Sequence, residues 1–83
     1  LVSALNAVKY QRAEKKIAEA ERWAQVADDN RIRYIELAEK HSGQRMIDIP
    51  ADDINEMKEC LENAEKADKK YTKLMKEVNC LWT

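Results

Sequence analysis

Nine positions near the end of the chain follow one another at alternating intervals of three and four residues. They are Ile54, Met57, Leu61, Ala64, Asp68, Tyr71, Met75, Val78 and Trp82. This alternation is typical of the a and d positions of a coiled coil, which form a continuous seam along one side of a helix. The segment from about 51 to 82 is therefore predicted to be one long helix, with Asp68 as the single charged interruption of its seam.

A second stretch without glycine or proline, residues 1–42, precedes this helix. Lys40 and His41 place basic side chains at its end, where the helix dipole is negative. Gly43 follows and readily adopts the left-handed conformation that closes a helix. Pro50 then suits the first turn of the next helix. These signals predict a first helix that stops near residue 42 and a second helix that starts near residue 51.

The connection between the two helices is short, so we expect them to fold back on each other. At its end, Asp53 and Glu56 are spaced as a capping box for the second helix. The sequence predicts an all-α fold, a coiled-coil-like antiparallel two-helix hairpin that forms a single domain. Its parts are helix 1 at about 1–42, a turn at about 43–50 and helix 2 at about 51–82.

The first helix repeats the three-four spacing with smaller side chains. Its positions are Ala13, Ile17, Ala20, Ala24, Ala27, Arg31, Tyr34 and Ala38. An antiparallel fold would place this alanine-rich row against the larger side chains of the second helix, and small against large allows dense packing without voids. A hairpin of 83 residues is only marginally stable alone, which favours association with copies or partners.

Arg31 and Asp68 are the two charged residues at core-type positions of the predicted seams. A polar residue in a seam costs stability but can fix register and orientation. In the simple fold these two residues are about one heptad out of register and do not face each other, so a pair between them would join two chains. The alternative is that each lies at the edge of the core with its charged group in water.

Folding back about the turn pairs residue 82 with about residue 10, so the start of the first helix extends beyond the second helix. Leu1, Leu5 and Val8 make this extension apolar. Exposed apolar clusters commonly mark interaction sites. The chain also begins inside a helical pattern without a capping residue, which indicates a piece of a longer protein. Either a partner or the rest of that protein would cover the cluster, and periodicity leaves both open.

Further apolar side chains lie beside both predicted seams. They are Trp23, Val26, Ile32, Ile35 and Leu37 on the first helix and Cys60, Ala67, Leu74 and Leu81 on the second. Helices of larger bundles use three apolar positions in seven, whereas a two-helix contact needs two. We expect a larger helical bundle, formed by two hairpins as a homodimer or by this hairpin and a helical partner. The predicted contact residues are Leu1, Leu5, Val8, Trp23, Leu74, Leu81 and Trp82.

Charged residues are unevenly distributed, although the net charge is only −1. Acidic side chains concentrate in residues 48–65, and basic ones in residues 66–77 and 9–22. This separation complements the dipole of each helix, and it could also orient a partner. An alternative function is binding of nucleic acid or a membrane surface through the lysine-rich end. The pI of about 5.9 disfavours that alternative, because dedicated phosphate binders are usually basic.

No pattern in the sequence indicates catalysis, a cofactor or a bound metal. His41 is the only histidine and has no nucleophile or second base spaced to work with it. Cys60 and Cys80 lie 20 residues apart on one predicted helix, too far to bond to each other. The sequence also lacks an apolar run long enough for a signal peptide or a membrane span. We therefore expect a soluble, non-enzymatic protein of the reducing cytoplasm.

The predicted architecture resembles that of helical-hairpin interaction modules, such as small secretion chaperones, phage assembly factors and coiled-coil adaptor segments. The resemblance covers the whole chain and depends on the hairpin pattern alone, without a family motif. It implies self-association or binding of a helical protein as the function, and it assigns no functional residue.

Overall fold

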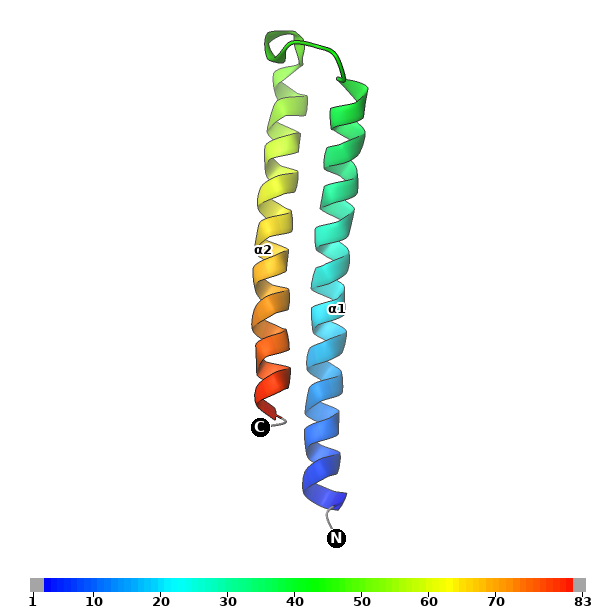
Figure 1. Ribbon diagram of the computed structural model, residues 1–83, viewed down its shortest axis with the longest axis vertical. Helices are drawn as coiled ribbons and strands as arrows, with labels where there is room; N and C mark the ends of the chain where they lie inside the picture. The colour runs from blue at the N-terminus through cyan, green and yellow to red at the C-terminus, as the bar shows by residue number, and fades with distance from the viewer. Residues whose placement is uncertain (1–2, 82–83) are drawn as a thin grey trace.

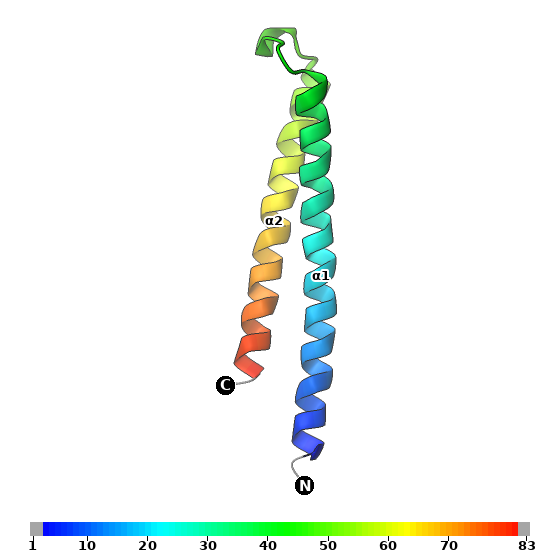
Figure 2. The same cartoon turned by 45° about the vertical axis from the view of Figure 1, so that its right-hand side comes forward.

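Two long helices joined by a short connection form the computed structural model, which describes residues 3–81 (Figure 1). Helix α1 spans Ser3–Lys40, the 3-10 helix η1 spans Met46–Asp48, and helix α2 spans Ala51–Leu81. Two views show α1 and α2 side by side in opposite directions (Figure 2), in a rod that measures 67 by 16 by 15 Å. The predicted all-α antiparallel hairpin is confirmed, and the larger bundle stays a prediction.

The end of α1 is closed by the residues that the sequence indicated. The amide of His41 still donates to the carbonyl of Leu37, at 3.2 Å. Gly43 then takes a φ of 81°, in the left-handed region that side chains with a Cβ disfavour. The amide of Gln44 donates to the carbonyl of His41 at 3.1 Å and completes the turn. The chain thereby leaves the helix axis within a few residues and begins the return toward α2.

The start of α2 differs from the prediction in one detail. The carbonyl of Pro50 accepts hydrogen bonds from the amides of Asp53 and Ile54, each at 3.1 Å, so α2 begins directly after the proline. Asp53 is already the third residue of the helix, too far inside it to act as an N-cap. Its carboxylate and that of Glu56 bind side chains of α1 instead. The predicted capping box is therefore wrong.

The contact between α1 and α2 is built mainly from small side chains. The buried apolar residues are Ala13, Ala20, Ala27 and Leu37 on α1 and Cys60, Ala64, Ala67 and Val78 on α2. Burial recurs at intervals of seven residues, at 13, 20 and 27 and again at 60 and 67, as in a coiled coil. The most deeply buried side chains are therefore mostly small on both helices, and the expected match of small against large stays a prediction.

Both helices are rotated by one position relative to the predicted seam. On α2 the buried row contains Cys60 and Ala67, whereas Leu61, predicted to lie inside, is 50% exposed. On α1 Leu37 is 2% exposed, whereas Ile17 is 37% exposed. On α2 the row of Cys60 and Ala67 faces the other helix in place of the predicted row of Leu61, and on α1 the row of Leu37 does so in place of the predicted row of Ile17. Positions 13, 20, 27, 64 and 78, which the two patterns share, are buried, whereas Tyr71, also shared, is 38% exposed.

The rotation also removes two charges from the interior of the hairpin. Arg31 Nη2 and Asp68 Oδ2 form an ion pair between α1 and α2, and the two side chains are 47% and 49% exposed. Charged groups buried without full compensation would destabilise the hairpin strongly. The expectation that these residues do not face each other within one chain is wrong, because the long arginine side chain spans the offset. They lie at the edge of the seam, outside its core.

Helix α1 extends past the end of α2 at the open end of the hairpin (Figure 1). Ala13 is buried, whereas Val8 and Tyr10 are 45% and 58% exposed. We call residues 3–12 the overhang. The predicted extension beyond α2 is therefore present in the part of the chain that the structure describes.

Candidate interaction surface

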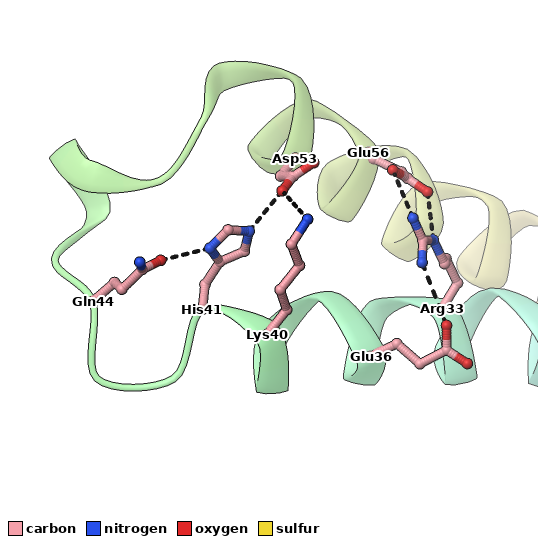
Figure 3. Close-up of polar contacts among 7 residues, drawn as sticks. All are labelled: Arg33, Glu36, Lys40, His41, Gln44, Asp53 and Glu56. Atoms are coloured by element: carbon pink, nitrogen blue, oxygen red, sulfur yellow. Dashed lines mark hydrogen bonds and ion pairs between the residues drawn. The ribbon is translucent and has the colours of Figure 1, made fainter.

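One side of the hairpin is bridged by charged side chains, and we call it the polar flank. The carboxylate of Glu56 accepts hydrogen bonds from Nε and Nη2 of Arg33 at 2.6 and 3.3 Å (Figure 3), and this contact raises the pKa of Arg33. Near the open end, Lys16 Nζ lies 2.7 Å from Glu77 Oε2. The hydrogen bond and the positive charge of Lys16 lower the pKa of Glu77. These contacts tie α1 to α2 in one register along the polar flank.

A buried histidine fastens the turn to the start of α2. Nε2 of His41 lies 2.6 Å from Oδ2 of Asp53, and its Nδ1 lies 2.6 Å from Oε1 of Gln44 (Figure 3). Lys40 Nζ approaches the same oxygen of Asp53 at 3.4 Å. The hydrogen bond from His41 and the positive charge of Lys40 lower the pKa of Asp53. The predicted role of His41 at the helix end thus becomes a structural one that spans the turn.

Trp23 also lies on the polar flank, where its ring is covered from within the chain. Lys70 Nζ lies 4.0 Å from the ring centroid, a cation–π contact. The ring and Leu74 line one shallow hollow together with Lys16 and Glu77. Trp23 and Leu74 are both partly buried. These two predicted contact residues therefore contribute to packing within the hairpin.

The opposite side of the hairpin is apolar, and we call it the apolar flank. Residues seven apart lie on one face of a coiled-coil helix, so the ion pair of Arg31 and Asp68 brings one row of each helix to this side. The remaining members of the two rows are Tyr10, Ile17, Ala24 and Ala38 on α1 and Ile54, Leu61 and Met75 on α2. The apolar flank is therefore continuous along the hairpin except at one central ion pair.

Toward the turn, the apolar flank deepens into a groove, which we call the turn groove. It is lined by Tyr34, Met46, Ile49, Ile54, Met57, Lys58 and Leu61. Leu61 is 50% exposed, Met46 is 74% exposed, and the neighbouring Ile47 is 85% exposed. Single exposed apolar residues are common, whereas several gathered in one groove make that groove a candidate binding surface. Apolar side chains of a partner could displace water from the turn groove.

The remaining predicted contact residues fall in different places. Val8 is exposed on the overhang, whereas Leu81 is partly buried at the end of α2. Leu1 and Trp82 lie outside the described residues, and Leu5 is described only as part of the backbone of α1. Of these five residues, only Val8 is seen as an exposed apolar side chain.

The three-four pattern of the sequence predicts several residues of the apolar flank to be buried. Ile17, Leu61 and Met75 were candidates for the buried seam, and they lie on the apolar flank instead. A signal for this was present, because Leu61 follows Cys60 and Met75 follows Leu74, and only one member of each pair can face α1. The leftover member must then point to the side of the hairpin.

Three further features of residues 3–81 concern metal ligands, membrane spans and a buried thiol. No three His, Cys, Asp or Glu side chains gather there in a way that could hold a metal ion. Neither α1 nor α2 has a stretch both long and apolar enough to cross a bilayer. Cys60 is buried, and burial raises the pKa of its thiol, which makes the thiol a poor nucleophile.

No protein-family model, curated protein or solved structure matches this chain. The difference between the polar flank and the apolar flank is therefore the main guide to function.

Proposed function

We propose that this hairpin is a non-enzymatic protein interaction module that binds helices through its apolar flank. The helices would belong to a second copy or to another helical protein. The observation that supports the proposal is the difference between the two flanks. On one flank Arg33 and Glu56 bridge the helices, whereas on the other Ile17 and Leu61 remain exposed at 37% and 50%.

Helical packing gives this difference a physical meaning. A helix with two neighbours needs three apolar positions in seven, the a, d and e positions of the heptad. In this hairpin the contact between α1 and α2 uses the first two positions, and the rows of the apolar flank supply the third. A neighbour that covered a half-exposed Leu or Ile would gain roughly 1 kcal/mol per side chain. Several such side chains together could hold a partner helix.

The charged and titratable groups also fit a binding protein better than an enzyme. The ring nitrogens of His41 lie 2.6 Å from side chains of Gln44 in the turn and Asp53 at the start of α2, which gives the histidine a structural role. Two lysines of the basic end are engaged within the chain, because Lys16 bonds Glu77 and Lys70 covers Trp23. This arrangement favours a protein partner over nucleic acid or a membrane surface.

Site-specific photocrosslinking tests the proposed surface. A benzophenone amino acid would replace Leu61 on the apolar flank, and a control protein would carry it in place of Asn63. Both positions are exposed and lie on α2, but Asn63 is two residues away, on the side of the polar flank. The experiment would be done with the purified protein and in cell extract.

We expect covalent products from position 61, either with a second copy or with another protein, and few from position 63. The label reacts with C–H bonds within a few ångströms, so it reports direct contact. If position 61 yields no more product than position 63 in both settings, the apolar flank is not a binding surface and the proposed function is wrong.

A further inference from the structure

We propose that the apolar flank binds a second copy of this hairpin that runs in the opposite direction, with a two-fold axis near the ion pair of Arg31 and Asp68. This inference rests on the proposed function, because it uses the same surface. Three features support it: the charge of the two halves of the rod, the central place of the ion pair, and the match between the two ends.

The two halves of the hairpin carry opposite charge. The open half, residues 3–26 and 68–81, has nine basic and five acidic side chains, a net charge of +4. The turn half, residues 27–67, has six basic and eleven acidic side chains, a net charge of −5. Two copies in the same direction would place like charges side by side. Opposite directions place each half against its complement, so electrostatics selects the antiparallel arrangement.

The ion pair lies close to the middle of the section in which α1 and α2 run side by side. Asp68 is near the centre of α2, which has 31 residues. Along the helix axis, Arg31 lies within about 7 Å of the part of α1 that faces this centre, at a rise of 1.5 Å per residue. A two-fold axis at this point superimposes the two-helix section of one copy on that of the other. The two apolar flanks then meet over their full length.

The contact surface of such a dimer is large enough for a specific interface. The face of the two-helix section is about 45 Å long at the rise of an α-helix and about as wide as the 16 Å width of the rod. It would bury on the order of 700 Å² per copy, roughly 1,400 Å² in total, within the range of stable protein interfaces.

The two-fold arrangement also covers the exposed ends. Each overhang passes the turn of the other copy, so Tyr10, in the same heptad row as Ile17, comes level with the second copy's Met46 and Ile47. Ile17 comes level with the second copy's turn groove. Met46 and Ile47 are 74% and 85% exposed in the single hairpin. The extra length of α1 thereby covers the apolar side chains of the connection.

The ion pair would fix the register of the two copies. At the two-fold axis, Arg31 of each copy lies beside Asp68 of both copies and keeps its contact with Asp28 at 3.7 Å. A slip by one heptad would press Arg31 against apolar side chains such as Leu61 and leave its charge poorly compensated. A polar group at one place in an apolar contact is a known device for setting register.

Sedimentation equilibrium and spin-label distances test the proposal together. The wild-type chain of 9.7 kDa should sediment at twice that mass over a range of concentrations. A nitroxide would then be attached to Ser42→Cys, at an exposed position in the turn, in a Cys60→Ala, Cys80→Ser background. Antiparallel copies should give an inter-label distance of about 45 Å, because each turn lies at the open end of the other copy.

A matched pair of variants tests the surface. Ile17→Glu plus Leu61→Glu places four charges in the proposed contact and should raise the dimer dissociation constant at least a hundredfold. Ala18→Glu plus Asn63→Glu makes the same change of charge at exposed positions off the apolar flank and should raise it less than threefold. Circular dichroism would confirm that both proteins remain helical.

Three results would overturn the proposal: a monomer at every concentration, an inter-label distance below about 25 Å, or equal dissociation constants for the two variants. A wild-type monomer whose position 61 still crosslinks to another protein would refute the second copy and leave the proposed function standing. A monomer without any crosslink would refute both.

Discussion

Replacing Leu37 with alanine tests the rotation of the seam most directly. Leu37 is 2% exposed and is the largest fully buried side chain described, although the three-four pattern of the sequence left it outside the seam. Truncation of a buried leucine loses its transfer free energy and leaves a cavity, at a typical cost of about 2–5 kcal/mol. Because Leu37 faces a single neighbouring helix that can relax toward it, we expect the lower part of that range, about 2–3 kcal/mol.

This loss is large for a domain of this size. An 83-residue chain has a total stability of about 4–12 kcal/mol. A loss of 2–3 kcal/mol should lower the melting temperature by roughly 8–24 °C. The measurement is urea and thermal unfolding followed by circular dichroism at low protein concentration, where association contributes least.

Leu61→Ala is the matched control, because it makes the same chemical change on a helix at a side chain that is 50% exposed. At low concentration it should cost less than about 1 kcal/mol. The seam predicted from the three-four spacing, with Leu61 inside and Leu37 outside, would make Leu61→Ala the more destabilising change. If Leu61→Ala destabilises the hairpin as much as Leu37→Ala, the rotation described above is wrong.

Three further outcomes follow from the packing and the turn. Ala20 is fully buried, so Ala20→Leu should force the helices apart and cost about 1–3 kcal/mol in urea unfolding, whereas Ala18→Leu, at an exposed position of the same helix, should be nearly neutral. Gly43→Ala should cost about 1 kcal/mol by the same measurement, because the backbone conformation with φ of 81° disfavours a Cβ even though no atom lies within 4 Å of one. The lowered pKa of Asp53 stabilises the folded state above the ordinary aspartate range, and this contribution is lost as pH falls through the lowered value, below about pH 4. Asp53→Asn removes a partner of His41, so the free energy of unfolding should fall less steeply as the pH is lowered from 7 to 2. An unchanged slope would contradict the pKa argument.

The helices and their ends could be predicted because local signals specify them. Gly43 has the positive φ that ends a helix, and Pro50 stands directly before α2. Both effects depend on the backbone of one residue and its immediate neighbours. The capping box failed for the opposite reason, since Asp53 and Glu56 bind side chains from the other helix that no local pattern contains.

The face of each helix that lies inside could not be read from periodicity alone. Positions 57, 64, 71 and 78 can be completed by the row of Cys60 and Leu74 or by the row of Leu61 and Met75, and both rows give an alternation of three and four. The choice depends on both helices at once. Rotation by one position brings small side chains into the contact and lets Arg31 meet Asp68 at its edge.

The candidate surface was consequently predicted only in outline. Apolar surface beyond the two-helix contact is present on the apolar flank, but none of the members named above is among the predicted contact residues. Trp23 illustrates the difficulty, because an aromatic residue on an amphipathic helix looks like a binding anchor until Lys70 is seen above its ring. That contact joins residues far apart in the sequence.

The separation of polar and apolar side chains onto opposite flanks makes the hairpin sensitive to the type of dissolved salt. Sodium chloride at high concentration screens ion pairs such as Lys16 to Glu77 and should weaken the contacts between α1 and α2 on the polar flank. Ammonium sulfate screens the same charges but also strengthens the tendency of Leu61 and its neighbours to leave water. Two salts at equal ionic strength should therefore affect this molecule differently. Sodium chloride should weaken the ion pairs of the polar flank, whereas ammonium sulfate should also promote contact between the apolar flank and other apolar surfaces.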